Sequence, residues 1–334
     1  MYVCGEQKGK KDIHMIKIET GSDSIFFNLA AEEYYMSVLT EPFYMIWRTT
    51  PSLISGRYQN VYNEVNLSYA RENGITVSRR KSGGGTVYAD LGGVMYSKFY
   101  PKKKGSEVTF AECSDDIARA ISSLGVKNVT YSGRNDLLAD GYKICGNARM
   151  ENEWGLLHHG SILFDVDFER MQNALMTDSG KMMSKGIKSV RSRVKNISEL
   201  TDKKLTYEQF KHVLWSAVDG DTVINAQNDR KKILPEAEFL ASWDFIYGVN
   251  PLFGFTAHQK FDGGRVCVSV DIKHSKIENI SFSGDFFYNG DISFLTSALC
   301  GSKYDIDTVK KILDEKSGFH KIDNCELASL ICGG

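Results

Sequence analysis

The chain has 334 residues, of which 42% are hydrophobic and 25% charged, and its formal net charge at pH 7 is −1. This composition is that of a soluble globular protein, long enough for one large domain and a smaller one. The near-zero charge excludes a globally basic binder of nucleic acid or of anionic membranes. No apolar run in the sequence reaches the length needed to span a bilayer.

The seven cysteines are scattered, and none forms a C-x-x-C pair. This pattern argues against a disulfide scaffold or a zinc site and favours reduced thiols. Residues 1–13 read as a polar leader that contains three lysines and has no apolar segment behind it. Together these features predict a cytoplasmic protein.

The hydrophobic pattern of the first two thirds predicts mixed strands and helices. A strand is expected at 14–19, followed by a helix over 25–39 that Ser22 or Ser24 would cap and that ends before Pro42. Further strands are expected at 43–48, 75–79, 93–100, 126–131, 137–139, 142–147 and 154–164, and further helices at 110–124, 167–176 and 206–218.

After Glu236 the pattern changes. Two strongly alternating strands are followed by short helices, which predicts a compact α+β module of about 85 residues. The strands are expected at 266–272 and 277–282, and the helices at 291–300, 305–314 and 323–332. We therefore expect a first domain over 14–240 and a second over 246–332.

The most informative stretch is 77–93, VSRRKSGGGTVYADLGG. Three cations at 79–81 lead, after one serine, into three glycines at 83–85. Consecutive glycines allow positive φ and a close approach of the backbone to a ligand, so the turn could direct several N–H groups at one anion. The spacing fits neither a P-loop nor a dinucleotide-binding fingerprint. A glycine turn joining the strands 75–79 and 93–100 in a hairpin is the simpler interpretation.

A second candidate is Lys143 in the stretch 141–148, GYKICGNA. It is either a lysine on an exposed strand face or a partly enclosed ammonium that faces a carboxylate or phosphate. Asp136 lies seven residues earlier, and Gly146 with Asn147 suggests close backbone approach, because a glycine otherwise weakens a strand.

The third candidate is the stretch 184–194, which carries four cations in the nine residues 185–193. It is either a solvated surface loop or a flap that closes over an anionic ligand and excludes water from a reactive intermediate.

Taken in order, these segments resemble the lipoate–protein ligases of the biotin/lipoate ligase fold, over roughly residues 15 to 200. The tail from Trp243 to about Leu330 resembles that family's small accessory domain. The matching segments are 28–33 (NLAAEE), 56–60 (GRYQN), 79–92, 133–137 (GRNDL), 141–148, 159–163 (HGSIL) and 185–193. The resemblance implies an α+β fold with a mixed-sheet, class II synthetase-like catalytic domain and a small α+β C-terminal domain.

The resemblance also implies a two-step reaction. Lipoate and Mg-ATP would give lipoyl-AMP and pyrophosphate, and the lipoyl group would pass to a lysine of a lipoyl carrier domain. Such carriers are the acyltransferase subunits of 2-oxo acid dehydrogenases and the glycine cleavage carrier protein. Because a carboxylate attacking an α-phosphate brings like charges together, cations and N–H donors are the chief requirement.

By the same resemblance, residues can be assigned to the site. Lys143 would contact the lipoyl carbonyl oxygen and the α-phosphate, and Asp136 is the candidate ligand of Mg²⁺. The nucleotide and acyl site would be formed by Arg80, Gly83, Gly84, Gly85, Thr86, Val87, Tyr88 and Lys143, with Lys188 and Arg191 in the flap. Val77, Val87 and Tyr88 are the expected walls of the acyl slot.

The sequence departs from the family pattern at two positions. Ala89 stands where a histidine precedes Asp90 in the family, and Gly93 stands where asparagine is common. Loss of that histidine could reshape the acyl pocket, and it is the one feature that supports a non-catalytic lipoate-binding protein.

Cys145 supports a further alternative, an ATP-independent octanoyl or lipoyl transferase that forms a thioester on this cysteine. Strand alternation would place Cys145 on the same face as Lys143, whose charge could activate the thiol. The adjacent His158 and His159 would point to opposite faces of a strand, which favours structural histidines over a metal site.

Overall fold

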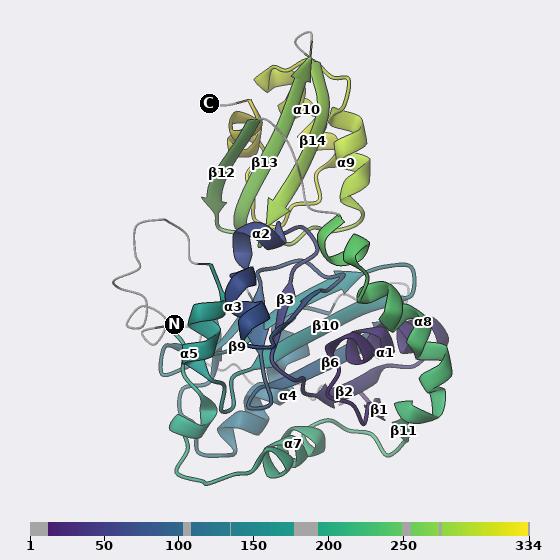
Figure 1. Cartoon of the computed structure of the whole chain (residues 1–334), viewed down its shortest axis with the longest axis vertical. Helices are drawn as coiled ribbons and strands as arrows, with labels where there is room; N and C mark the ends of the chain where they lie inside the picture. Colours follow the sequence, from purple (N-terminus) through teal and green to yellow (C-terminus); the bar gives the residue numbers. More distant parts are fainter. Residues whose placement is uncertain are drawn as a thin grey trace, which may run out of the picture.

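The structure is a computed structural model that describes residues 13–102, 108–133, 135–176, 193–248, 255–273 and 276–332. Figure 1 shows a large lower part and a smaller upper unit made by the last part of the chain. Within the described ranges, no helix combines the length and apolarity that crossing a bilayer requires.

An eight-stranded mixed sheet forms the centre of the large part. Strand β1 runs parallel to its neighbours β11 and β2, and every other pair in this sheet is antiparallel. Across the sheet the order is β11 (Val223–Asn225), β1 (Ile16–Glu19), β2 (Phe43–Trp47), β6 (Val94–Pro101), β10 (Gly155–Ile162), β9 (Tyr142–Glu151), β8 (Asp136–Ala139) and β7 (Thr130–Tyr131).

Helices cover both faces of this sheet (Figure 1). Along β2, Tyr44 and Ile46 belong to one hydrophobic core, whereas Phe43, Met45 and Trp47 belong to the other, as strand alternation requires. Helices α4 (Phe110–Ser122) and α7 (Tyr207–Ser216) contribute to the first core, and α1 (Ile25–Val38) and α8 (Arg230–Leu240) to the second.

A second, three-stranded sheet carries the glycine-rich stretch. Its central strand β3 (Ser52–Ser55) pairs in parallel with β4 (Thr76–Arg79) and antiparallel with β5 (Val87–Ala89). The predicted hairpin between 75–79 and 93–100 is therefore wrong, because β4 and β6 lie in different sheets. The glycines carry the chain from β4 past β3 to β5, a three-residue strand that the pattern did not indicate.

Ser24 caps α1 by accepting a hydrogen bond from the backbone N–H of Phe27 at 3.4 Å, so that part of the predicted cap is confirmed.

The remaining elements of the large part are short. The short elements are α2 (Val61–Glu64), α3 (Leu67–Glu72), α5 (Phe168–Ala174), η1 (Ile197–Glu199), η2 (Ala226–Asp229) and η3 (Asp244–Gly248).

The upper unit is an antiparallel sheet covered by three helices. The two predicted strands and the three predicted helices are present, and one further strand, β12, was not expected. The elements are β12 (Phe255–Phe261), β13 (Gly264–Lys273), β14 (Lys276–Gly284), α9 (Ile292–Leu299), α10 (Ile306–Lys316) and α11 (Asn324–Ile331).

Candidate active site

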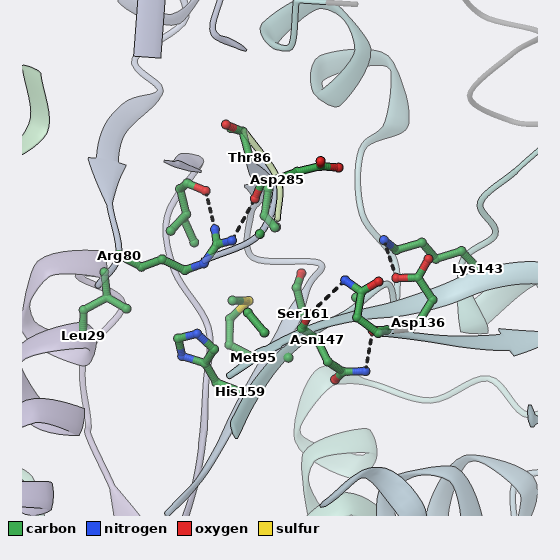
Figure 2. A pocket seen from close by; sticks show the side chains of 18 of the residues that line it. Leu29, Arg80, Thr86, Met95, Asp136, Lys143, Asn147, His159, Ser161 and Asp285 are labelled. Carbon is green, nitrogen blue, oxygen red and sulfur yellow. Dashed lines mark hydrogen bonds and ion pairs between the residues drawn. The ribbon is translucent and has the colours of Figure 1, made fainter. Parts of the chain in front are cut away.

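A cavity of about 240 Å³ lies where β9 and β10 meet the glycine-rich loop and the upper unit (Figure 2). One part of its lining is apolar, and another carries both cations and carboxylates. The apolar residues are Leu29, Trp47, Ile54, Val87, Met95 and Ala148. The others are Arg80, Gly84, Gly85, Thr86, Asn135, Asp136, Lys143, Gly146, Asn147, His159, Gly160, Ser161 and Asp285.

Lys143 and Asp136 form an ion pair on neighbouring strands of this cavity. The Nζ of Lys143 lies 2.8 Å from Oδ1 of Asp136, and their side chains are 37% and 27% exposed. The lysine is thus a partly enclosed ammonium that faces a carboxylate, in a cavity that the glycines at 84 and 85 also line. A half-open cation of this kind can neutralise charge on an incoming anion.

A β-bulge separates Lys143 from Cys145. Strand β9 places Cys145 opposite Leu137 but Lys143 opposite Leu138, so two steps on β9 match one step on β8. Because Leu137 and Leu138 point to opposite faces, the two β9 side chains do as well. The expectation that Cys145 shares a face with Lys143 is therefore wrong. Burial raises the pKa of the Cys145 thiol despite the nearby ammonium, which opposes thiolate formation.

The backbone of Lys143 pairs with residues 193–195, at the end of the cationic stretch. The backbone N–H of Lys143 donates to the carbonyl of Arg193 at 2.7 Å, and that of Lys195 donates to the carbonyl of Lys143 at 3.1 Å. The predicted flap residues Lys188 and Arg191 lie outside the described residues.

The guanidinium of Arg80 is buried against the loop that it precedes. Its Nη2 donates to the carbonyls of Gly83 and Gly85 at 2.7 and 2.9 Å, and its Nη1 donates to that of Ile54 at 2.9 Å. Burial lowers the pKa of Arg80 to about 10, which leaves it charged at neutral pH. Arg80 therefore brings positive charge to the cavity while most of its donors hold the backbone.

Three of the residues predicted for the nucleotide and acyl site do not line the cavity. Alternation along β5 points Val87 into the cavity and Tyr88 away from it. Tyr88 instead packs in the core around Leu53, where Val77, one of the expected acyl walls, also lies. Gly83 is not among the lining residues either, whereas Gly84, Gly85 and Thr86 are.

Sequence reasoning missed several residues of this site. His159 faces the cavity, whereas the preceding His158 is buried beside Tyr96, so the two do point to opposite faces. Asn147 donates from Nδ2 to the carbonyl of Asn135 at 3.0 Å, and its Oδ1 accepts from Tyr96 at 2.6 Å. The segment 159–163 of the family resemblance was the one signal for His159.

The upper unit supplies a wall of the cavity through the turn after β14. Asp285 lines the cavity, and the carbonyl of Phe286 accepts a hydrogen bond from the N–H of Gly84 at 3.2 Å. The ring of Tyr58 stacks on that of Phe286 with centroids 5.0 Å apart. No local pattern pointed to Asp285, which is 149 positions beyond Asp136 in the sequence.

The carboxylates of the cavity bear on metal binding. In the part of the chain that the structure describes, no group of three or more His, Cys, Asp or Glu side chains could hold a metal. Asp136 and Asp285 are the two carboxylates among the lining residues. A single carboxylate suits Mg²⁺ when phosphate oxygens and water complete its shell, so Asp136 fits a metal that arrives with a nucleotide.

The sequence matches two protein families in order along the chain. Residues 24–219 match the family described as Lipoyl protein ligase A/B catalytic domain, and residues 250–331 match Bacterial lipoate protein ligase C-terminus. Lipoate–protein ligase 1 of Staphylococcus aureus (strain Mu50 / ATCC 700699) is 36% identical over 314 residues, which is 91% of this chain and 95% of that protein.

Solved structures share the fold. The P. falciparum LipL1 in complex with lipoate has a TM-score of 0.81 at 23% identity, covering 96% of this chain and 99% of its own. A bipartite lipoate protein ligase of Thermoplasma acidophilum, described with its E2 lipoyl domain, has 0.60 at 22% identity, covering 73% and 100%. Lipoate-protein ligase A bound with ATP has 0.56 at 20%, covering 72% and 100%. The predicted α+β fold, with a large mixed sheet and a small C-terminal unit, is confirmed.

Proposed function

This chain belongs to the lipoate–protein ligase family, and on that basis we propose that it is an ATP-dependent enzyme that converts lipoate to lipoyl-AMP and then lipoylates a carrier lysine. The observation that carries the proposal is that Lys143 and the glycine-rich loop line the same cavity as an apolar region. A fatty carboxylate and a nucleotide phosphate need these two surroundings side by side.

The apolar region would hold the lipoyl chain. Leu29, Trp47 and Met95 come from α1, β2 and β6, so the slot is built on rigid elements of the large part. Val87 extends this surface toward the glycine-rich loop. Burial of a methylene chain here is worth about 0.8 kcal/mol per CH₂, which would anchor the substrate while its carboxylate faces Lys143.

The polar region would carry out the first step. The lipoate carboxylate attacks the α-phosphate of ATP, and pyrophosphate leaves. Lys143 would contact both reacting oxygens, while Arg80 and the loop from Gly84 to Val87 would surround the nucleotide. Asp136 would hold Mg²⁺, which neutralises phosphate charge when bound. Lys188 and Arg191 would cover the adenylate against water.

The second step would pass the lipoyl group from AMP to the amine of a lysine. The proposed acceptors are lipoyl domains of 2-oxo acid dehydrogenase acyltransferases and the glycine cleavage carrier protein. The E2 lipoyl domain described with the T. acidophilum ligase supports this class of partner.

The alternatives receive less support from the geometry. A thioester route would need Cys145 as a nucleophile, but this thiol is fully buried and lies on the face opposite Lys143. A passive lipoate-binding protein would not need the Lys143–Asp136 pair beside the glycine-rich loop.

Lipoate-dependent exchange between ATP and pyrophosphate tests the proposal. We expect exchange in the wild type and in Cys145→Ala, and a loss of about 100-fold or more in Lys143→Ala, because the charge that stabilises the reacting oxygens is removed. Absence of exchange in the wild type, with an acyl adduct that disappears in Cys145→Ala, would establish the transferase instead. Lipoate binding without exchange or adduct would indicate a passive binder.

A further inference from the structure

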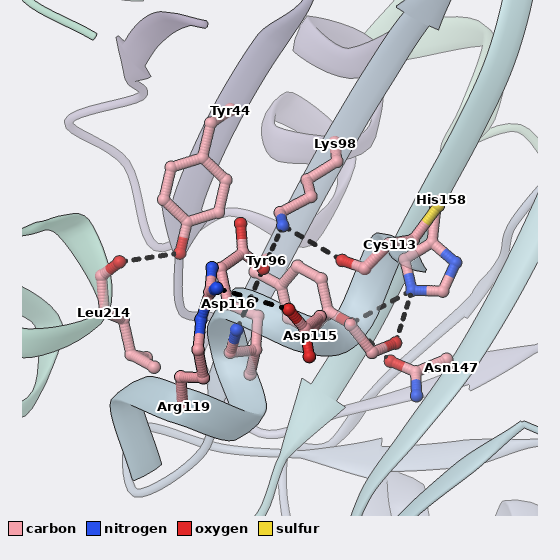
Figure 3. A network of polar contacts seen from close by, with 12 residues as sticks. Tyr44, Tyr96, Lys98, Cys113, Asp115, Asp116, Arg119, Asn147, His158 and Leu214 are labelled. Atoms are coloured by element: carbon pink, nitrogen blue, oxygen red, sulfur yellow. Dashed lines mark hydrogen bonds and ion pairs between the residues drawn. The ribbon is translucent and has the colours of Figure 1, made fainter. Parts of the chain in front are cut away.

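A tyrosine and an asparagine meet across a glycine in the large sheet. Gly160 on β10 pairs with Asn147 of β9 on one side and with Tyr96 of β6 on the other. The hydroxyl of Tyr96 donates to Oδ1 of Asn147 at 2.6 Å, although a whole strand lies between them (Figure 3). A Cβ at position 160 would lie 2.4 Å from that Oδ1 and 2.4 Å from Cε1 of Tyr96, so the glycine leaves room for this contact.

The two side chains lie on the face of the sheet that is turned away from Lys143. Tyr96 and Cys145 belong to the core that α4 covers, and Sγ of Cys145 also donates to Oδ1 of Asn147, at 3.4 Å. Tyr96 is 0% exposed and Asn147 4%, so water does not compete for these bonds. Their influence on the cavity therefore passes through the backbone of β9 and of the segment beside it.

The amide of Asn147 is satisfied in only one orientation. Its oxygen accepts from Tyr96, and its Nδ2 donates to the carbonyl of Asn135 at 3.0 Å. Turned the other way, the amide would place its oxygen against that carbonyl, and two acceptors would meet with no hydrogen between them. The hydroxyl of Tyr96 therefore selects the orientation in which Asn147 holds Asn135.

Three hydrogen bonds join Asn135 to Asn147. The carbonyl of Asn135 accepts from the backbone N–H of Asn147 at 2.8 Å as well as from its Nδ2, and Nδ2 of Asn135 donates to the carbonyl of Asn147 at 3.0 Å. A carbonyl and the next N–H share one rigid plane. Holding the carbonyl of Asn135 thus also fixes the N–H of Asp136, which donates to Oγ of Ser132 at 3.2 Å. The carboxylate that pairs with Lys143 branches from the chain directly after this plane.

We propose that Tyr96 and Asn147 are positioning residues for the bound metal. By holding Asn135 they direct the carboxylate of Asp136 into the cavity. This inference rests on the proposed function, since it assigns Mg²⁺ to Asp136. Asn135 and Asp136 both line the cavity, whereas Tyr96 acts from the buried core behind the sheet.

Calorimetric titration of ATP with Mg²⁺ and in EDTA tests this role. We expect Mg²⁺ to tighten ATP binding in the wild type and Asp136→Asn to remove that gain. Asn147→Ala keeps the backbone N–H but loses Nδ2, and it should weaken binding of Mg-ATP about tenfold, whereas Tyr96→Phe should weaken it about fivefold. In EDTA the affinity of both variants for ATP should stay within about twofold of wild type.

The double variant shows whether Tyr96 acts through Asn147. If it does, Tyr96→Phe should weaken Mg-ATP binding by less than about twofold once Asn147→Ala is present. Two independent contributions would multiply to about fiftyfold, which would contradict this path.

Tyr44→Phe is the matched control. The hydroxyl of Tyr44 lies in the same core and donates to the carbonyl of Leu214 at 3.2 Å, so this variant also loses one buried hydrogen bond. Leu214 belongs to α7, not to the strands that carry Asn147 and Asp136. The free energy of unfolding should fall as it does in Tyr96→Phe, while the affinity for Mg-ATP stays that of the wild type.

Hydrogen exchange of the protein without ligands measures the positioning itself. Peptides that cover residues 135–139 should exchange at least about fivefold faster in Asn147→Ala and Tyr96→Phe than in the wild type, because the plane before Asp136 is released. The same peptides should exchange at the wild-type rate in Tyr44→Phe.

Wild-type exchange of residues 135–139 in Tyr96→Phe and Asn147→Ala would overturn the proposal. Wild-type affinity of Tyr96→Phe for Mg-ATP would also overturn it, provided that Asp136→Asn has lost the response to Mg²⁺. Equal weakening of ATP binding with Mg²⁺ and in EDTA would show a general structural role instead. If Mg²⁺ left ATP binding to the wild type unchanged, the metal assignment of the proposed function would fail, and with it the metal role. Hydrogen exchange would then still decide whether the two residues hold the segment.

Discussion

Gly146 leaves space for the ammonium of Lys143. A Cβ at position 146 would lie 2.9 Å from Nζ and 3.1 Å from Cε of that lysine. The obstructing atoms are the end of a flexible side chain, so Gly146→Ala should fold normally but push the ammonium away from Asp136. We predict an unfolding midpoint close to that of wild type and a loss of exchange activity of at least about tenfold.

Combining Gly146→Ala with Lys143→Ala separates this explanation from a backbone effect. If the alanine acts by displacing Lys143, it should add no further loss once the lysine is absent. Additive losses in the double variant would show that Gly146 acts by another route.

Burial of His158 predicts a pH dependence of stability. Burial, with smaller effects from Lys98 and neighbouring cations, holds the pKa of His158 well below its ordinary 6.5. As the pH falls below about 6.5, the unfolded chain gains a proton that the folded chain does not bind. The free energy of unfolding should therefore decrease by up to about 1.4 kcal/mol per pH unit for this group.

The measurement compares urea unfolding of the wild type and His158→Gln between pH 7 and pH 5. Between these pH values the free energy of unfolding should fall less steeply in His158→Gln than in the wild type, by up to about 1.4 kcal/mol per pH unit, whatever the stability of the variant at pH 7. Parallel curves would refute the prediction. Burial also lowers the pKa of His320, so only the difference between the two proteins isolates His158.

At the scale of single residues, sequence could find those whose chemistry is written in a local pattern. Three adjacent glycines and a lysine between apolar neighbours indicated the loop and Lys143. Asp285 could not be found in this way, because a fold contact brings it to the cavity from the C-terminal unit. Tyr88 was misplaced because the strand β5, whose alternation turns it inward, was not anticipated.

At the scale of elements, a buried ion pair joins helix α4 to strand β6. Nζ of Lys98 pairs with the carboxylate of Asp116 and donates to the carbonyl of Cys113 at 2.9 Å (Figure 3). Lys98→Met would leave that carboxylate without its cation and should destabilise the fold by about 3 kcal/mol. Chemical denaturation checks this value.

Two further variants define the origin of that loss. Adding Asp116→Asn to Lys98→Met should recover much of the stability, because no unpaired charge remains. Lys310→Met breaks an exposed pair with Asp314 on α10 and should leave the midpoint unchanged. An equal effect at both sites would contradict the role of burial.

Element prediction failed where packing or strand pairing with distant segments overrode the local sequence pattern. Helix α8 was not among the predicted elements; it contains Pro235, and packing against α1 maintains the helix. The glycine-rich stretch was predicted to join 75–79 and 93–100 in a hairpin because β5 was missed, whereas β3 lies between β4 and β5, and β6 belongs to the other sheet. The bulge in β9 reversed the face of Cys145 for a similar reason, since strand periodicity assumes unbroken pairing.

At the scale of the whole molecule, stacked rings hold the two parts together. The ring of Tyr58 in the large part lies against that of Phe286 in the upper unit. The carbonyl of Tyr58 also accepts a hydrogen bond from the N–H of Gly284 at 3.0 Å. Tyr58→Ala should remove about 2 kcal/mol of coupling. We predict that calorimetry will then resolve two melting transitions.

Phe294→Ala is the control for this change, because Phe294 is an aromatic residue of the upper unit that is 74% exposed. It should leave the melting profile as in the wild type. A single transition at an unchanged temperature in Tyr58→Ala would show that the stack contributes nothing to the junction.

The general architecture followed from the order of the predicted elements, because the two strongly alternating strands and the short helices after Glu236 mark a separate small module. How the two parts meet did not follow. The turn at 284–287 is short, and only the fold brings it against the glycine-rich loop. The division at 240 and 246 stays a prediction.

Position 56 has a consequence for reading related sequences. A Cβ on Gly56 would overlap the carbonyl oxygen of Gly84, a backbone atom that cannot swing aside as a side chain can. The first residue of the 56–60 segment is thereby coupled to a loop almost thirty positions later. A homologue with any larger residue at this position must therefore fold its glycine-rich loop differently. Such a residue would indicate that the binding geometry described here does not apply to that homologue.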